Sequence, residues 1–458
     1  MSENQLPEAF ESQMLALLGS HEFTLFKEGL ALPSQTSIRL NQRKFVALPY
    51  PRRAIPWAKE GYFLEERPSF TMDPTFHAGA YYVQEASSMF ISHILESQKI
   101  QKGIFLDLAA APGGKSTLLS SYLGEEGLLV ANEVIASRAQ ILKENVIKWG
   151  LGNTVVTHND PEHFDPLQGF FDLVLVDAPC SGEGMFRKDP LAREEWSAEH
   201  VSLCSARQKR IVDKAGELVK GGGYLLYSTC TFNEKENEEI LRFLIEEFAF
   251  EPVRIALDPS WGVVETQVIS AEETFFGYRF FPHKVAGEGF FITVLRRPDA
   301  AYSLVAPTTK EFKHHSLKRV GDKDATVLEQ EVGGDGTGKF YLLQDAYFRM
   351  HGGYSQELEK VAQVLSIRYF GVELGKKQGK EWIPSHEWAL STLSKNRFPE
   401  KELSVEEALD FLRKKEQSFA GLPLGWILLT YQKLPLGWIK NLGNRANNYY
   451  PKEWRIRN

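Results

Sequence analysis

Apolar segments typical of buried β-strands alternate with amphipathic segments typical of α-helices over residues 104–248. We predict strands over 104–108, 127–132, 154–158, 171–176 and 223–228, with a late strand over 289–295. Helices are predicted over 116–123, 137–149, 205–219 and 237–248, the third ending in a Gly221–Gly223 cap. This alternation is typical of an α/β fold, a mostly parallel twisted sheet with helices on both faces.

Acidic residues follow four successive predicted strands: Asp107, Glu133, Asp160 and Asp177. Ligands of parallel sheets bind outside the carboxyl ends of the strands, so these side chains predict a binding site. A carboxylate after the second strand, here Glu133, suits the two hydroxyls of a ribose because it accepts two hydrogen bonds.

The run from Leu106 to Lys115, Leu-Asp-Leu-Ala-Ala-Ala-Pro-Gly-Gly-Lys, leads from a strand into a helix through small residues. Small residues let the backbone approach a ligand, and the free N–H groups of the helix start face it. A phosphate-binding P-loop is one alternative, but it requires glycine where this chain has Ala109. A packing turn that binds nothing is the other.

Two of the three cysteines follow strands that should end at this site. Cys180 lies in Asp-Ala-Pro-Cys-Ser-Gly and Cys230 in Ser-Thr-Cys-Thr-Phe, whereas Cys204 has no such setting and is interpreted as structural. A thiolate beside a cofactor pocket is suited to covalent catalysis. Spacing alone does not choose between Cys180 and Cys230.

The run 107–115 resembles the first motif of the RNA (cytosine-5) methyltransferases of the Nol/Nop/Sun family, and the resemblance extends over residues 36–297. It implies a Rossmann-like class I methyltransferase domain that binds S-adenosyl-L-methionine. Glu133 would bind the ribose, Asp160 would lie near the adenine, and Arg138 would also contact the cofactor. The methionine part would be wrapped by Ala109, Ala110, Ala111, Pro112, Gly113, Gly114 and Lys115.

The same resemblance implies the chemistry. Cys230 would add to C6 of a cytosine so that C5 can accept the methyl group, and Cys180 would assist release of the product. Asp177 would lie between cofactor and base and hydrogen-bond the N3/N4 edge, with Lys115 orienting Asp177 or the cofactor carboxylate.

Several segments are candidates for RNA contact. Arg39, in a short motif over 37–41, would contact a phosphate, and Arg187 and Lys188 follow Cys180 where the base would enter. Residues 76–87 also resemble a family motif, with RNA contact and packing both open for its aromatic residues.

The tail over 434–455 is similar to the PUA-like RNA-binding domain of the bacterial F-type subgroup that modifies 16S ribosomal RNA. This implies 16S RNA, within or near the 30S subunit, as the partner. Transfer RNA is a close alternative substrate, and a non-catalytic RNA-binding or assembly factor is an alternative of another class.

Charge is unevenly distributed along the chain. The net charge is −7, but residues 301–458 hold 24 Lys and Arg against 19 Asp and Glu, a net of +5, which leaves −12 for the first 300 residues. A basic C-terminal face is suited to phosphate, although a solvated surface gives the same pattern. We predict four parts: an N-terminal α+β RNA-binding extension (1–95), the methyltransferase domain (96–298), an accessory domain (299–380) and a β-rich PUA-like domain (381–458).

The N-terminal residues lack a basic segment followed by an apolar run, and no stretch reaches the ~18 apolar residues that cross a membrane. Three cysteines in 458 residues argue against a disulfide framework. We therefore expect a cytoplasmic monomer with no membrane partner and no metal site.

Overall fold

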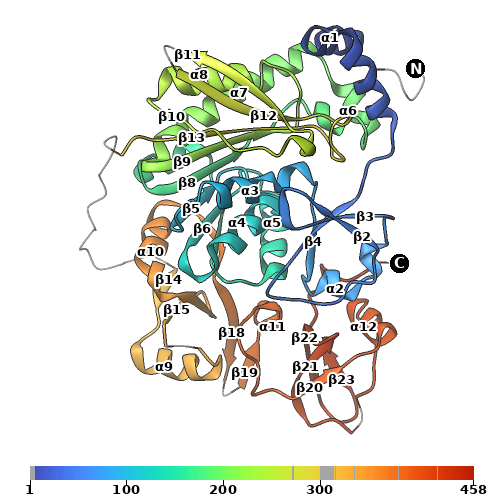
Figure 1. The fold of residues 1–458 in the computed structure, drawn as a ribbon. Coiled ribbons are helices and arrows are strands. Elements are labelled where there is room, and N and C mark those ends of the chain that lie inside the picture. The colour runs from blue at the N-terminus through green and yellow to red at the C-terminus, as the bar shows by residue number, and fades with distance from the viewer. Residues whose placement is uncertain are drawn as a thin grey trace.

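A ten-stranded sheet lies at the centre of the computed structural model, which describes residues 6–270, 273–299, 314, 316–334, 336–379, 381–419 and 421–457 (Figure 1). Its parallel part runs in the order β9-β8-β5-β6-β7. These strands are β5 (Ile104–Asp107), β6 (Leu128–Asn132), β7 (Thr154–Thr157), β8 (Phe171–Asp177) and β9 (Val219–Thr229).

Antiparallel strands extend the sheet at both edges. Next to β9 lie β13 (Phe290–Arg296), β12 (Glu273–Phe280) and β11 (Val264–Ser270), and β10 (Glu251–Pro252) pairs with β13. At the other edge, β17 (Ile367–Phe370) pairs with β7. Because β17 comes from a distant part of the sequence, the C-terminal region is built into the central sheet.

The order of the strands places helices on both faces. The chain moves along the sheet from β5 to β6 to β7 through α4 (Gly114–Leu123) and α5 (Ala136–Trp149), and back from β8 to β9 through α7 (Ala198–Leu218). Connections between parallel strands are right-handed, so helices lie on opposite faces of the sheet when their connections run in opposite directions along it. Helices α4 and α5 therefore lie on one face and α7 on the other. Accordingly α3 (Phe90–Ser97) packs on α4, and α8 (Glu238–Glu247) packs on α7.

The third predicted helix differs from the structure at both ends. Helix α7 starts at Ala198, after Ser197 accepts a 3.0 Å hydrogen bond from the His200 amide, and it ends at Leu218. The predicted glycine cap was wrong, because Gly221–Gly223 lie inside β9. Gly222 has a φ of +77°, and β9 is irregular at this end, where its register with β8 shifts. The Gly222 amide donates to the Arg297 carbonyl at 2.9 Å, which ties this irregular part of β9 to the residue that follows β13.

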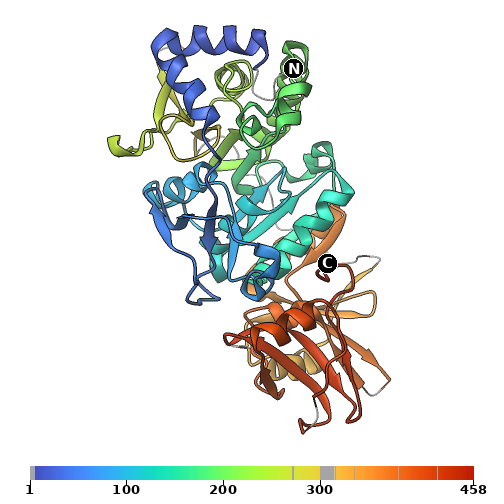
Figure 2. The same ribbon diagram turned by 90° about the vertical axis from the view of Figure 1, so that its right-hand side faces the viewer.

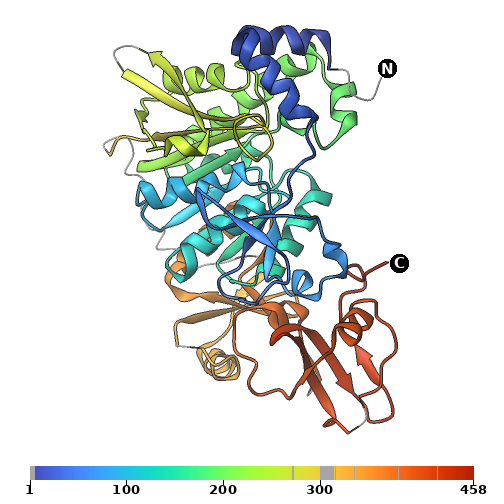
Figure 3. The ribbon, with the colours of Figure 1, turned by 45° about the vertical axis from the view of Figure 1, so that its right-hand side comes forward.

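The N-terminal extension combines a helix and a small sheet, as predicted. Helix α1 (Glu8–Ala31) bends at Gly19, where φ is +74°. The sheet has the order β2-β3-β1-β4, formed by β1 (Ser37–Leu40), β2 (Arg52–Ile55), β3 (Ala58–Leu64) and β4 (Tyr81–Val83), and α2 (Pro74–His77) precedes β4. In Figure 3, α1 lies along the same end of the molecule as the green helices α6 (Pro190–Glu195) and α7.

Two further sheets form the C-terminal part. The first, β14-β15-β16-β18-β19, comprises β14 (Leu317–Arg319), β15 (Gly338–Leu343), β16 (Ala346–His351), β18 (Val372–Gln378) and β19 (Glu381–Pro384). The second comprises β20 (Glu400–Glu402), β21 (Gly425–Tyr431), β22 (Leu434–Asn441) and β23 (Ala446–Asn448). The associated helices are α9 (Asp322–Glu331), α10 (Ser355–Val364), α11 (His386–Leu390) and α12 (Val405–Leu412).

The boundary expected at residue 380 falls within the β18–β19 hairpin. The last sheet lies directly below the N-terminal sheet in Figure 2, and α12 and β22 both contact α2. Buried residues of both parts, including Ile38, Tyr81, Phe411 and Ile427, share one apolar cluster. Among the described residues, no helix combines the length and apolarity needed to span a membrane.

Candidate active site

The loop after β5 forms the floor of the site. Helix α4 begins at Gly114, and Gly113 before it has a φ of +114°, a conformation that favours glycine. Asp107 at the end of β5 is completely buried and accepts a 2.6 Å hydrogen bond from Ser116 Oγ on α4, which ties the strand to the helix. Its other oxygen, Oδ1, has no partner among the described residues, and burial raises the pKa of Asp107 to about 7.

A cavity of about 180 Å³ opens over this loop. Most of the residues predicted to hold the cofactor line it, together with Asp107: Ala109, Ala110, Ala111, Pro112, Gly114, Lys115 and Asp177. Gly113 shapes the loop without lining the cavity. The opposite wall is formed by the N-terminal extension, through Tyr82, Val83, Gln84 and Glu85.

Of three further predicted cofactor residues, Glu133 and Asp160 follow the neighbouring strands β6 and β7, and Arg138 lies in α5. Glu133, after β6, is 2% exposed and accepts from the Ile135 amide at 2.9 Å. Arg138 donates to the Ala111 carbonyl at 2.8 Å and lies 3.7 Å from a Glu133 oxygen, so it links the loop to β6. Asp160 accepts from the Glu162 amide at 3.2 Å and starts the 3₁₀ helix η4 (Pro161–Leu167).

Lys115 and Asp177 form an ion pair at the mouth of the cavity. Lys115 Nζ lies 2.7 Å from Asp177 Oδ2, while Ser228 Oγ donates to Asp177 Oδ1 at 2.8 Å. Burial alone would lower the pKa of Lys115, but the charges of Asp177, Asp107 and Cys230 together raise it. Lys115 is therefore held as a cation between the cofactor loop and the thiols.

The two predicted cysteines meet above β8 and β9. Cys180 Sγ and Cys230 Sγ are 3.0 Å apart, both residues are half-buried, and both are free thiols. The hydrogen bond with Cys230, followed by burial, raises the pKa of Cys180 well above its usual value, so Cys180 keeps its proton. Cys204 lies buried in α7, consistent with a structural role.

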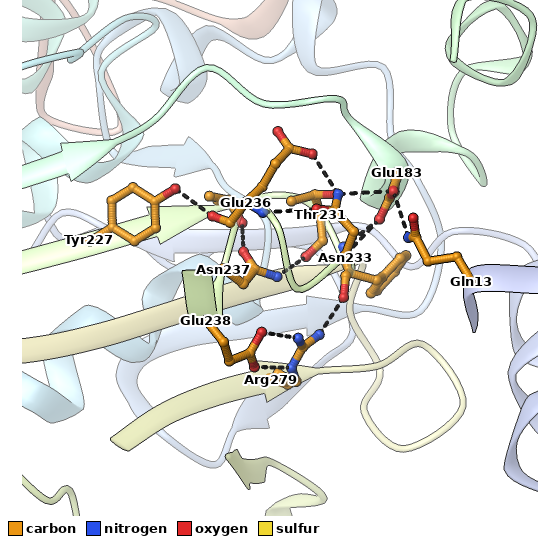
Figure 4. A network of polar contacts seen from close by, with 11 residues as sticks. Gln13, Glu183, Tyr227, Thr231, Asn233, Glu236, Asn237, Glu238 and Arg279 are labelled. Atoms are coloured by element: carbon orange, nitrogen blue, oxygen red, sulfur yellow. Dashed lines mark hydrogen bonds and ion pairs between the residues drawn. The ribbon is translucent and has the colours of Figure 1, made fainter. Parts of the chain in front are cut away.

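A buried polar network, which the sequence did not predict, joins the two cysteine loops (Figure 4). Glu183, from the Cys180 loop, accepts from the amides of Phe232 and Asn233 in the Cys230 loop, at 2.7 and 3.0 Å. In return Glu236, from the Cys230 loop, accepts from the Ser181 amide at 2.9 Å. Each loop thus supplies the carboxylate that binds the backbone of the other.

Both carboxylates are completely buried, and further donors surround them. Glu183 also accepts from Trp196, Asn233 and Gln13, the last from α1. Gln208 of α7 donates to Glu236 at 2.9 Å, and burial raises the pKa of Glu236. In a sequence, acidic residues in polar loops look like surface residues, so no pattern predicted that Glu183 and Glu236 are buried.

Two of the three predicted RNA contacts are corrected by the structure. Arg39 is 4% exposed, donates to Gln84 and Thr117, and stacks on Trp149, so it braces α4 instead of facing a phosphate. The Arg187 side chain is 6% exposed and pairs with Glu288 at 2.8 Å. Lys188 is exposed and stays a candidate for RNA contact.

The aromatic segment over 76–87 includes both packed and half-buried side chains. Tyr81 is 2% exposed and donates to Asp73 at 2.6 Å, and Gln84 is held by Arg39. Tyr82 is half-buried and lines the cavity.

The fold and the site are those of an S-adenosyl-L-methionine-dependent methyltransferase. Residues 93–296 match the family model described as 16S rRNA methyltransferase RsmB/F. Residues 6–86 match the N-terminal domain of 16S rRNA methyltransferase RsmF, and residues 398–456 match the methyltransferase RsmF PUA domain.

Curated relatives match along nearly the whole chain. Ribosomal RNA small subunit methyltransferase F of Erwinia tasmaniensis is 32% identical over 473 residues, covering 98% of this chain and 96% of the relative. The protein of the same name from Escherichia coli K12 is 31% identical over 470 residues, with the same coverage. The chain therefore belongs to the 16S rRNA methyltransferase RsmB/F family, with the RsmF domain arrangement.

Solved structures agree on the fold. A methyltransferase homologue from Pyrococcus horikoshii is 27% identical with a TM-score of 0.54, covering 64% of this chain and 96% of that one. NSun6 from the same organism, solved with SFG, is 20% identical with a TM-score of 0.53, covering 64% and 98%.

Proposed function

We propose that the chain methylates C5 of a cytosine in 16S ribosomal RNA through a covalent adduct with Cys230. The observation that carries the proposal is the pair of free thiols, 3.0 Å apart, beside the Lys115–Asp177 ion pair and the cofactor loop. When bound, S-adenosyl-L-methionine supplies an electrophilic methyl group. The loop 109–115 would hold it, together with Glu133 and Asp160 after the neighbouring strands and Arg138 of α5.

The protein residues have separate roles in the proposed reaction. Cys230 loses its proton and forms a bond to C6, which makes C5 nucleophilic toward the methyl group. The proton on C5 then passes to a base, the C6–S bond breaks, and its electrons return to Cys230. Cys180, which stays protonated next to the attacking sulfur, assists this release.

Asp177 would hydrogen-bond the N3/N4 edge of the base, and a protonated N3 favours attack at C6. Lys115 keeps the Asp177 carboxylate in place through the 2.7 Å ion pair. We further propose that the chain acts as a cytoplasmic monomer on 16S RNA within or near the 30S subunit.

Transfer of labelled methyl from S-adenosyl-L-methionine to unmodified 30S subunits, 16S RNA and tRNA tests the proposal, with product nucleosides identified. Label in 5-methylcytidine from 30S or 16S RNA is expected. Label confined to tRNA would overturn 16S RNA as the substrate. Cofactor binding without label in any RNA would favour a non-catalytic assembly factor.

Cys230→Ala separates the roles of the two thiols. This variant should bind the cofactor normally yet transfer no methyl group, because it cannot form the C6 adduct. Retained activity would assign the nucleophile to Cys180 instead.

A further inference from the structure

A second cavity, of about 160 Å³, lies next to the cavity over the cofactor loop. Tyr82 and Val83 of β4 line both, so the two cavities share a wall. The other lining residues are Phe76, Gly79, Tyr81, Asn145, Lys148 and Trp149. The second cavity therefore lies where the N-terminal extension meets the last turns of α5.

The cavity combines aromatic rings with a lysine. Four of its eight lining residues are aromatic, and two of these, Phe76 and Tyr82, are half-buried and so keep ring surface exposed. Lys148 Nζ lies 4.9 Å from the ring centre of Trp454 and 5.9 Å from that of Phe76. Within the part of the chain that the structure describes, this ammonium makes no ion pair.

The lysine is also positioned by its surroundings. The Lys148 carbonyl accepts from Lys44, and a Cβ on Gly79 would lie only 1.9 Å from that carbonyl oxygen, so α5 and the extension are in close contact here. Trp454 comes from the PUA-like part. The cavity thus lies between the cofactor cavity and the C-terminal part, at a junction of three regions of the chain.

We propose that this second cavity binds one unpaired nucleobase of the RNA strand, near the target cytosine, with Lys148 contacting the adjoining phosphate. Bases stack on exposed aromatic rings, and this contact tolerates any sequence because every base has a π-face. A lysine without an ion-pair partner supplies the matching charge for the backbone. The proposal rests on RNA being the substrate, as in the proposed function.

Kinetics of methyl transfer to unmodified 30S subunits, counted as total label whatever the product, test the two contacts. Phe76→Leu keeps an apolar side chain but removes the stacking ring, so KM for RNA should rise about five- to hundredfold with kcat nearly unchanged. Lys148→Gln should raise KM and reduce the slope of log affinity against log salt by about 1, and Lys148→Arg should restore the slope.

Lys143→Gln is the matched control, because Lys143 is on the same helix but lies over the Tyr369 ring, on another face. It should leave both KM and the salt slope as in the wild type. A salt slope that falls equally for Lys143→Gln and Lys148→Gln would overturn the phosphate contact, since any charge loss would then have the same effect.

A photoreactive phenylalanine analogue, p-azidophenylalanine, at position 76 identifies the occupant. A crosslink to a nucleotide a few positions from the methylated cytosine is expected. Crosslinks only to distant RNA, or normal kinetics in Phe76→Leu and Lys148→Gln, would overturn the inference. A wild-type product other than 5-methylcytidine would instead overturn the proposed function, because these measurements do not depend on which atom is methylated.

Discussion

The buried carboxylate of Glu183 should determine the position of Cys230, and Glu183→Gln tests this. The carboxylate accepts from five donors: the Phe232 and Asn233 amides, Asn233 Nδ2, Trp196 Nε1 and Gln13 Nε2. The new amide keeps the volume but offers one accepting oxygen where the carboxylate offers two. If that oxygen faces the backbone amides, its NH₂ group faces the three side-chain donors.

The loss of stability in Glu183→Gln depends on how many buried donors are left without an acceptor. The Gln13 amide can turn to present its oxygen, and Asn233 Nδ2 also donates to Thr231 at 2.8 Å. The Trp196 N–H has no such alternative. With about 1–3 kcal/mol for an unsatisfied buried donor, the free energy of unfolding should fall by about 1–3 kcal/mol.

The effect on catalysis should exceed the effect of lost stability. The two amides that Glu183 binds follow Cys230 by two and three residues. A neutral amide oxygen accepts weaker hydrogen bonds than a carboxylate, so these amides are held less tightly and the thiol can move relative to the base. A displacement of about 1 Å reduces a rate by up to about a hundredfold. We therefore expect kcat for methyl transfer to 30S subunits to fall roughly ten- to hundredfold, with cofactor affinity unchanged.

Glu359→Gln is the matched control. Glu359 is also buried, pairs with Arg319 and accepts from Tyr341 at 2.9 Å, but it lies in the C-terminal part. It should lose stability in urea unfolding and keep kcat. The reasoning is refuted if Glu183→Gln keeps a normal kcat, or if the two variants lose kcat equally at equal loss of stability.

Three further predictions concern the same site. Cys180→Ser should slow release, so a covalent protein–RNA adduct should accumulate on denaturing gels; absence of both adduct and activity would exchange the roles of the thiols. Lys115→Met removes the cation that holds the Asp177 carboxylate in place, so kcat should fall about tenfold; an unchanged kcat would remove Lys115 from the mechanism. Asp107 has a folded-state pKa of about 7 against an ordinary 3.8, so between about pH 4 and 7 the folded state holds a proton that the unfolded state has lost. This one group should therefore lower the free energy of unfolding by about 1.4 kcal/mol for each unit by which the pH rises in that range. Asp107→Asn should flatten that dependence in denaturant titrations, and an equal slope in both proteins would contradict the assignment.

The parts of the fold that the sequence predicted are those that depend on local patterns. The short buried strands β5 to β8 have continuous apolar runs, and the polar residues that follow them lie at one edge of the sheet because the strands are parallel. The meeting of Cys180 and Cys230 follows from the same geometry, since β8 and β9 are neighbours.

Properties that depend on distant contacts were not predictable. Strand β17 pairs with β7 across more than two hundred residues of sequence, and no local pattern indicates its partner. Arg39 was predicted to contact phosphate from its motif and Arg187 from its position after Cys180, yet Arg39 donates to Gln84 and Arg187 pairs with Glu288. A local pattern does not show that a side chain is buried against a distant partner. Glu183 was missed for the same reason, because a sequence does not show which acids are buried.

These contacts give the N-terminal extension a structural role in addition to the predicted RNA binding. Phe10 and Phe26 of α1 pack with Phe186 and Phe232, one from each cysteine loop, at ring-centre distances of 4.9 and 5.0 Å. Gln13 of the same helix donates to Glu183. On the other side of the site, Arg39 donates to the α4 residues Gly114 and Thr117. The extension therefore holds both the thiol loops and the cofactor loop, and a chain without it would lack the supports of its own active site.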